Sequence, residues 1–204
     1  MRTGGIVLCG GCSSRMGRPK AWLPFCGELM LPRVARILRE VVDPVVVVAA
    51  PDQEVPLLPA GVAVVRDEGE GKGPLAGLAA GLAALEAQCD AVFLSSCDVP
   101  LLRAAFVRRV VARLEGSSAA LAAVPRVGGF FHPLAGAYRI AVLPAVRAML
   151  AAEQFRATGL LALVATCAIE ADELTDADAE LDSLRNLNTP DEYEAALIRV
   201  REGS

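Results

Sequence analysis

The first residues that could carry chemistry form a glycine loop near the N-terminus, with the sequence LCGGCSSRMGRPK at residues 8–20. The loop follows a short apolar run and contains three cations, Arg15, Arg18 and Lys20. Glycines let backbone N–H groups approach a phosphate chain, and arginine and lysine neutralise its charge. The spacing matches neither G-x-x-x-x-G-K-[ST] nor G-x-G-x-x-G. Because no acidic residue precedes Glu28, the loop predicts an anion-binding segment; the alternative is an ordinary turn with solvated arginines.

Two further polar segments follow apolar runs. Residues 67–78 read DEGEGKGPLAGL, so Asp67 and Lys72 precede a predicted helix whose N-terminus is suited to anions. The carboxylate of Asp67 could accept hydrogen bonds from base N–H groups or ribose hydroxyls. Residues 97–100 read CDVP, and Mg²⁺ is often held by one or two carboxylates together with substrate phosphates. Asp98 is therefore a candidate Mg²⁺ ligand, with capping of the next helix as the alternative.

The second half of the chain offers fewer candidates. His132 is the single histidine and follows two glycines, which favours either a ligand-binding or a packed side chain. The segment NLNTP at 186–190 places Asn186 and Asn188 two residues apart. In an extended segment these amides face one side and can hydrogen-bond a polar ring system. The alternative for both asparagines is loop formation and helix capping.

The six cysteines favour reduced thiols and argue against a zinc site. Cys9 and Cys12 form a C-x-x-C pair, but a structural zinc site needs a second pair or several histidines. A thioredoxin-like role is also disfavoured, because the pair lies inside the glycine loop. The simplest interpretation is that small side chains are tolerated in a tight loop. The remaining cysteines are Cys26, Cys89, Cys97 and Cys167.

Composition limits the class of protein. The chain has 204 residues, of which 54% are hydrophobic, and this excludes general disorder. A net charge of -4 and an aromatic content of 4% argue against nucleic-acid binding. The longest simple apolar run, residues 45–50, is far below the ~18 residues of a membrane helix, and the start does not resemble a signal peptide. We expect one domain over 1–204 in the cytoplasm, with no membrane partner.

Apolar strand patterns alternate with helical patterns along the chain. Strands are predicted at 5–8, 45–49, 62–65, 91–94, 119–124, 134–138 and 167–170. Helices are predicted at 31–42, 75–87, 103–114, 140–152, 159–165 and 191–201, and the acidic segment 170–182 is expected to be a solvated loop or edge. This alternation predicts an α/β fold with a mostly parallel sheet. Ligands of such sheets bind beyond the carboxyl ends of the strands, where the polar segments fall.

Taken together, these segments resemble the molybdenum cofactor guanylyltransferase family of the nucleotidyltransferase superfamily. The glycine loop and CDVP occur widely in nucleotidyltransferases, whereas Asp67 with GPLAGL, followed by HPL and NLNTP, is the more specific combination. The resemblance extends from residue 8 to residue 190 and implies a three-layer αβα Rossmann-like nucleotidyltransferase fold. It also implies a nucleotide half at about 1–100 and a cofactor-acceptor half at about 101–204.

The resemblance implies an enzyme that joins GTP to molybdopterin, releases pyrophosphate and uses Mg²⁺. Lys20, Arg15 and Asp98 would be catalytic, and Asp98 would also bind the metal. His132, Asn186 and Asn188 would bind the acceptor. Transient complexes with other molybdenum-cofactor proteins are expected from the resemblance only. The nucleotide would be bound by Leu8, Cys9, Gly10, Gly11, Lys20, Asp67, Gly73, Pro74, Leu75 and Asp98.

The sequence departs from the family pattern at two places. Cys9 stands where alanine is common, a change that backbone contacts would survive. Residues 48–50 lack the polar side chain that the family often has there, so the reaction class is better supported than the choice of guanine. The alternatives are a related nucleotidyltransferase that uses CTP or another phosphorylated acceptor, and a catalytically silent nucleotide-binding homologue.

Overall fold

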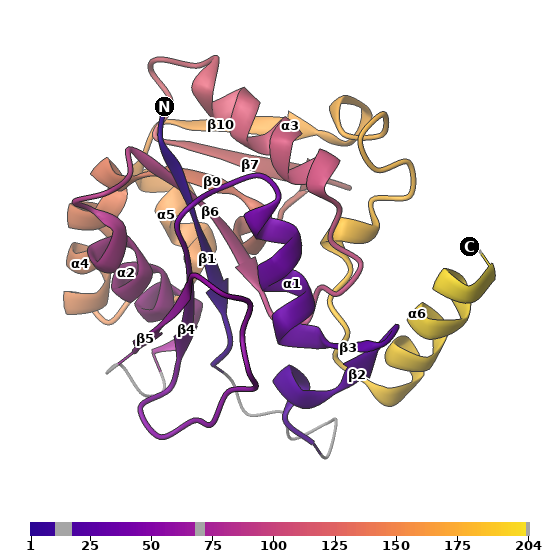
Figure 1. Ribbon diagram of the computed structural model, residues 1–204. Coiled ribbons are helices and arrows are strands. Elements are labelled where there is room, and N and C mark those ends of the chain that lie inside the picture. Colours follow the sequence, from indigo (N-terminus) through magenta and orange to yellow (C-terminus); the bar gives the residue numbers. More distant parts are fainter. Residues whose placement is uncertain (11–17, 68–71, 203–204) are drawn as a thin grey trace.

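The structure, a computed structural model, describes residues 1–10, 18–67 and 72–202 (Figure 1). In these ranges eight strands form one sheet in the order β10-β7-β9-β6-β1-β4-β5, with β8 paired to β7. Two short strands, β2 (Pro24–Phe25) and β3 (Glu28–Leu29), form a separate hairpin. The strands of the large sheet are β1 (Thr3–Leu8), β4 (Val45–Ala49), β5 (Val62–Arg66), β6 (Ala91–Ser96), β7 (Ala122–Val127), β8 (Phe130–Phe131), β9 (Ala137–Arg139) and β10 (Thr166–Glu170).

The helices cover both faces of the sheet, so the predicted αβα layering is confirmed. Successive side chains of a strand point to opposite faces. In β1, Val7 accordingly packs in the cluster with α1 (Met30–Arg39) and α3 (Ala104–Glu115). Its neighbours Ile6 and Leu8 pack in the opposite cluster, against the remaining sheet-covering helices. Those helices are α2 (Gly73–Leu85), α4 (Leu143–Ala151) and α5 (Ala157–Leu163).

Helix α2 approaches β1 closely because two of its residues are glycines. A Cβ atom on Gly77 would lie 2.8 Å from Cδ2 of Leu8, and one on Gly81 would lie 2.6 Å from Cδ1 of Ile6. Both distances are shorter than van der Waals contact between carbon atoms. The glycines of this helix therefore set the separation between α2 and the strand that leads into the glycine loop.

The sheet is mostly parallel, as predicted, and two short strands, β8 and β9, run the other way. β1 pairs in parallel with both β4 and β6, and β4 pairs in parallel with β5. β9 is antiparallel to β6 and β7. The prediction of a strand over 134–138 was partly wrong, because Pro133–Ala135 forms a 3-10 turn before β9 begins at Ala137. In this turn the N–H of Ala135 donates to the carbonyl of His132 at 3.0 Å and not to a neighbouring strand, which delays the start of β9.

The acidic segment 170–182 was predicted to be solvated, and this is wrong for two of its carboxylates. Asp178 and Asp182 are buried, with exposed fractions of 1% and 3%. Arg103 forms ion pairs with both, at 3.3 and 3.5 Å, and the N–H of Ser183 donates to Asp178. Buried charges need such partners. The segment is thereby fixed to the start of α3, from which it leads to the asparagines at 186 and 188.

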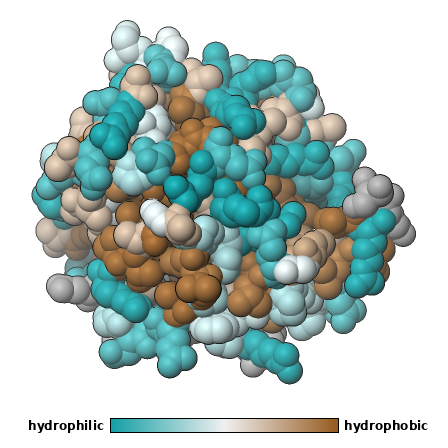
Figure 2. All heavy atoms as spheres, viewed as in Figure 1, coloured by the Kyte–Doolittle hydropathy of each residue, from teal (hydrophilic) through white to brown (hydrophobic). Residues whose placement is uncertain are grey.

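The C-terminal helix α6 (Pro190–Glu202) packs on the β2–β3 hairpin at the side of the molecule (Figure 1). Thr189 caps it, since its Oγ1 accepts from the N–H of Glu192 at 3.2 Å. On the face of the molecule that Figure 2 shows, apolar side chains are exposed between hydrophilic ones, including some near α6. Within the described part of the chain, no helix is both long and apolar enough to cross a membrane.

Candidate active site

Three polar side chains that are far apart in the sequence meet beyond the carboxyl ends of β1 and β6. Nζ of Lys20 donates to Oδ2 of Asp98 at 2.9 Å and to Oδ1 of Asn188 at 2.8 Å. The side chains of Lys20 and Asp98 are 16% and 15% exposed, so the ion pair is largely withdrawn from water. At such a site a charge interaction is stronger than at a fully exposed surface. We refer to Lys20, Asp98 and Asn188 as the charged cluster.

Asp98 is held from both sides. Its Oδ1 accepts from Oγ of Ser96 at 2.5 Å, and its backbone carbonyl accepts from the N–H of Leu187 at 2.8 Å. The second bond ties the end of β6 to the NLNTP segment. The alternative that Asp98 caps the next helix is wrong, because α3 begins at Ala104 with Arg103 in the N-cap position.

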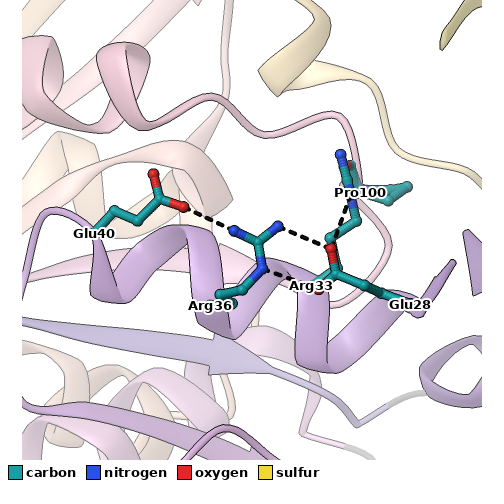
Figure 3. Close-up of polar contacts among 5 residues, drawn as sticks. All are labelled: Glu28, Arg33, Arg36, Glu40 and Pro100. Carbon is teal, nitrogen blue, oxygen red and sulfur yellow. Dashed lines mark hydrogen bonds and ion pairs between the residues drawn. The ribbon is translucent and has the colours of Figure 1, made fainter. Parts of the chain in front are cut away.

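A surface network braces the segment that follows Asp98. Figure 3 shows Arg33 of α1 between the backbone carbonyl of Pro100 and the carboxylate of Glu28; its Nε lies 2.8 Å from that carbonyl. Arg36 bonds both Glu28 and Glu40. The hydrogen bond from Arg36 holds the pKa of Glu28 below its usual value of 4.5. This network connects α1 to the loop that carries the catalytic candidate Asp98.

The end of β1 lies between β4 and β6. The N–H of Cys9 donates to the carbonyl of Val48 at 2.8 Å, and the carbonyl of Leu8 accepts from Cys97 at 2.9 Å. Gly10 is exposed and directly follows this buried pair of positions. The predicted site residues Gly11 and Arg15, like Cys12, lie outside the described residues.

Gln53 fixes the backbone at Cys9. Its Nε2 donates to the carbonyl of Cys9 at 2.9 Å and contacts the Cys9 sulfur at 3.3 Å, while its Oε1 accepts from the N–H of Ala50. The hydrogen bond from Cys97, aided by Gln53 and the charge of Arg66, lowers the pKa of the Cys9 thiol although burial opposes this. The bond to Cys9 and burial raise the pKa of Cys97.

The second nucleotide segment flanks the same sheet edge. The N–H of Asp67 donates to the carbonyl of Ala49 at 2.9 Å, which holds Asp67 beside the end of β4. Gly73 starts α2 with φ of +66°, a left-handed conformation that L side chains rarely adopt. Pro74 follows it in the first turn and the side chain of Leu75 is fully buried. The structure thus places Gly73, Pro74 and Leu75 at the start of α2, where the N–H groups of Gly73 and Leu75 have no partner within the helix, as at any helix N-terminus.

A cavity of about 420 Å³ opens next to the charged cluster. It contains two predicted acceptor residues, His132 and Asn186, and also Pro74 from the start of α2. Val99, the neighbour of Asp98, forms part of its wall. Asn188 takes a different position from Asn186, since its side chain joins Lys20 in the charged cluster. The cavity is lined by Pro74, Val99, Phe131, His132, Pro133, Leu134, Ala135, Phe155, Arg156, Ala157, Thr158, Ser183, Leu184 and Asn186.

His132 is held in this wall as a neutral donor and acceptor. Its backbone N–H donates to the carbonyl of Pro125 at 2.9 Å. Burial lowers the pKa of its imidazole below 6.5, so the ring is uncharged at pH 7. A neutral imidazole can offer one N–H and one acceptor nitrogen to a polar heterocycle.

The sequence profile of the MobA-like NTP transferase domain matches residues 5–167, which includes the glycine loop, Asp67, Asp98 and His132. The match covers well over half of the chain. The chain belongs to the MobA-like NTP transferase family. It is therefore a member of a nucleotidyltransferase enzyme family, as the sequence motifs predicted.

Two relatives of this MobA-like chain extend the comparison beyond residue 167. A protein of Bacillus cytotoxicus is 31% identical over 193 residues, covering 93% of each chain. One of Pelotomaculum thermopropionicum is 33% identical over 196 residues, covering 95% of this chain and 91% of the relative. Both are named probable molybdenum cofactor guanylyltransferase.

Solved structures share the fold of this MobA-like chain. Molybdopterin-guanine dinucleotide biosynthesis protein A of Archaeoglobus fulgidus gives a TM-score of 0.81 at 20% identity, covering 98% of this chain and 99% of the other. A cytidylyltransferase of Thermus thermophilus that acts on 2-C-methyl-D-erythritol 4-phosphate gives 0.68 at 19% identity, over 98% and 100%. A manganese complex of Rv0371C from Mycobacterium tuberculosis gives 0.62 at 18% identity, over 97% and 99%. At these identities the likeness shows the fold alone.

Sequence reasoning missed several residues of this MobA-like site. Gln53 was not singled out, although its side chain hydrogen-bonds both the N–H of Ala50, just beyond β4, and the carbonyl of Cys9. In the cavity wall, Phe155, Arg156 and Thr158 were missed. Arg156 stands in the N-cap position of α5, and the predicted helix began two residues later than α5 does. Because arginine is abundant in this chain, an arginine before a helix carried no distinctive signal.

Proposed function

We propose that this protein transfers GMP from GTP to the terminal phosphate of molybdopterin and releases pyrophosphate. The observation that carries the proposal is the meeting of Lys20, Asp98 and Asn188, which come from three separate family-like motifs, beside a cavity that contains His132 and Asn186. The names of the relatives from Bacillus cytotoxicus and Pelotomaculum thermopropionicum support the same reaction.

In this proposal the nucleotide lies over the first half of the chain, at about 1–100. The backbone at Leu8, Cys9, Gly10 and Gly11 holds the base and ribose, together with the carboxylate of Asp67. The start of α2 supplies the N–H groups of Gly73 and Leu75 to anionic oxygens, while Pro74 between them fixes the first turn. Arg15 and Lys20 neutralise the triphosphate.

The acceptor lies over the second half, at about 101–204, with the cavity as its binding site. His132 and Asn186 bond the polar ring system, and Asn188, at the border with the nucleotide, orients Lys20 toward the triphosphate. Arg156 adds a cation to the cavity wall, which suits the terminal phosphate of molybdopterin. The two halves interlock at this point, because Pro74 and Val99 belong to the first half and still line the cavity.

The donor set at Asp98 fits a hard divalent cation such as Mg²⁺. Mg²⁺ takes few protein ligands and completes its shell with water and phosphate oxygens. In the ranges 1–10, 18–67 and 72–202, no group of three or more His, Cys, Asp or Glu could hold a metal unaided. Asp98 would therefore hold the ion jointly with the nucleotide. The manganese complex of Rv0371C supports the use of a divalent cation in this fold.

The main catalytic task is the neutralisation and alignment of two anions. An oxygen of the acceptor phosphate forms a bond to the α-phosphorus of GTP, and the bond from that phosphorus to the pyrophosphate oxygen breaks. Lys20 and Arg15 stabilise the charge that develops on the leaving pyrophosphate. A Mg²⁺ ion, when bound, neutralises phosphate oxygens. Because a phosphate nucleophile is already ionised at pH 7, no strong general base is required.

A nucleotide panel tests this function. The protein is incubated with Mg²⁺, molybdopterin and GTP, CTP, ATP or UTP in turn, and pyrophosphate and the mass of any dinucleotide product are measured. We expect pyrophosphate and a GMP-linked pterin product in equal amounts with GTP. A product with CTP alone would assign the protein to the cytidylyl branch, whose fold it shares with the Thermus thermophilus enzyme. No product with any nucleotide would support a silent nucleotide-binding homologue.

A further inference from the structure

The ends of β1 and β6 carry two cysteines at neighbouring positions. Leu8 lies opposite Ser96 in this parallel pair, so Cys9 and Cys97 follow at the same level of the two strands. The N–H of Cys97 donates to the carbonyl of Leu8 at 2.9 Å, which continues the strand pairing to this point. The side chains of Cys9 and Cys97 are both buried in the same cluster of core residues, on the face of the sheet that α1 and α3 cover. Two reduced, buried thiols therefore lie at neighbouring positions at the sheet edge that carries the site.

The surroundings of Cys9 favour its thiolate. Nε2 of Gln53 lies 3.3 Å from the Cys9 sulfur, and the guanidinium of Arg66 donates to the carbonyl of Gln53 at 2.7 Å. A hydrogen-bond donor and a nearby cation both stabilise negative charge on sulfur. Cys9 is 4% exposed, and Gly10 beside it is exposed, so the pair lies just beneath the surface of the site.

We propose that Cys9 and Cys97 form a peroxide-responsive pair that closes to a disulfide and slows nucleotide transfer. The Cys9 thiolate attacks hydrogen peroxide; the O–O bond breaks, one oxygen leaves as water after protonation, and Cys9 becomes a sulfenic acid. The sulfur of Cys97 then attacks the Cys9 sulfur, a second water leaves, and the S–S bond forms. Two thiols are oxidised and one peroxide is reduced to two waters. A dithiol reverses the reaction by thiol–disulfide exchange.

The effect on turnover rests on the proposed function, whereas the formation of the disulfide does not. Cys97 directly precedes Asp98 of the charged cluster, and Cys9 directly precedes Gly10 of the glycine loop. A covalent bond between the two sulfurs is shorter than any non-bonded approach of two thiols, so its formation draws the two strand ends together. That movement displaces both Asp98, the candidate metal ligand, and the protein backbone at Cys9 and Gly10 that would hold the nucleotide. Small displacements of reacting groups strongly lower the rate of a reaction.

Peptide mapping tests the disulfide. The protein is treated with limiting hydrogen peroxide, the remaining thiols are alkylated, and trypsin digestion is followed by mass spectrometry without reduction. Trypsin places Cys9 and Cys12 in peptide 3–15, and Cys89 and Cys97 in peptide 73–103. We expect these two peptides to be joined. A bond between Cys9 and Cys12 would instead leave peptide 3–15 unjoined and would overturn the proposal.

Matched serine variants assign the bond. We expect Cys12→Ser to keep the joined peptides and Cys97→Ser to lose them, with Cys9 then trapped as a sulfenic acid by dimedone. Cys167→Ser, on the distant β10, serves as the control and should match the wild type. Joined peptides that persist in Cys97→Ser, or unjoined peptides in Cys12→Ser, would contradict the assignment. Peptide mapping detects the disulfide whether or not a variant is as stable as the wild type.

Each variant is then compared with its own reduced form. With GTP and molybdopterin, we expect oxidation to lower wild-type turnover about tenfold or more and dithiothreitol to restore it. Cys97→Ser should lose far less under the same peroxide dose. If the joined peptides form while turnover is unchanged, the regulatory part of the proposal is overturned. If the reduced protein transfers no nucleotide at all, the proposed function fails while the disulfide result stands.

Discussion

The charged cluster and the neighbouring cavity differ in their polarity and therefore in the chemistry that each can support. In the cluster, Lys20 is held within 2.9 Å of Asp98 and 2.8 Å of Asn188, and little of the pair is exposed. The cavity of about 420 Å³ has mainly apolar walls with a few polar groups, among them His132 and Arg156. A rigid charged centre suits phosphate chemistry, whereas a broad wall with few polar groups suits selection of an organic acceptor.

The largest expected effect is in the cluster. Lys20→Ala removes the cation that neutralises the leaving group, so we expect turnover to fall by about 10²- to 10³-fold. The steady-state rate of pyrophosphate release measures it. Arg147→Ala is the control, because it removes a cation from the exposed side of α4, away from the cluster. Equal losses in the two variants would remove the special role of the cluster.

A smaller and different effect is expected in the cavity. Arg156→Ala should raise KM for molybdopterin about tenfold, the value of one charged hydrogen bond, with little change in KM for GTP. Steady-state kinetics with each substrate varied in turn measures both constants. Arg147→Ala on the exposed side of α4 is the control. A shift in KM for GTP as large as that for molybdopterin would contradict the separation of the two regions.

Helix α2 connects the two regions, since it begins at the cavity and packs on β1. Gly77→Ala puts a Cβ 2.8 Å from Leu8, and overpacking of this kind costs about 1–3 kcal/mol. We expect a lower free energy of unfolding by urea denaturation, with weaker binding of both substrates. Gly116→Ala is the control, because its Cβ would meet its nearest neighbour, the Ala112 carbonyl, at 3.4 Å. An unchanged stability of Gly77→Ala would show that α2 can shift without loss.

The smallest effect concerns Glu28, which braces the loop after Asp98. Its pKa is lowered in the folded state, so it stabilises the fold above about pH 4.5, and this contribution is lost as pH falls through the lowered value. Because the side chain is partly exposed, we expect Glu28→Gln to cost less than about 1 kcal/mol at pH 7. Urea denaturation at pH 7 and pH 3 measures the difference between wild type and variant. A variant deficit that grows on acidification would contradict this sign.

Much of the fold was predictable because strong apolar patterns dominate it. β4 has the predicted bounds, and α1 begins one residue before its predicted start. The predictions that were wrong concern residues whose environment depends on contacts with distant parts of the sequence. The acidic segment around Asp178 and Asp182 predicts solvated side chains. Both are buried in the structure because Arg103, some 75 residues earlier, forms ion pairs with them. The β2–β3 hairpin is too short to leave a periodic pattern.

The candidate site also contains both residues that the sequence predicted and residues that it did not. Residues at strand ends, such as Asp98, were found because an α/β sheet fixes where its strand ends meet. Their exact partners were not found, since the bond from Lys20 to Asn188 joins residues 168 apart in the sequence. Gln53 and Arg156 were missed because their surroundings come from other elements, and no local spacing marks them.

One measurement tests the division between the two regions most directly. Equilibrium binding of Mg²⁺–GTP and of molybdopterin is measured separately by titration calorimetry, so that no reaction can occur, for wild type, Lys20→Ala and Arg156→Ala. We expect a crossed pattern: Lys20→Ala weakens GTP binding about tenfold and spares molybdopterin, and Arg156→Ala does the reverse. If each variant weakens both ligands equally, or if neither changes either affinity, the assignment of nucleotide and acceptor to these two regions is contradicted.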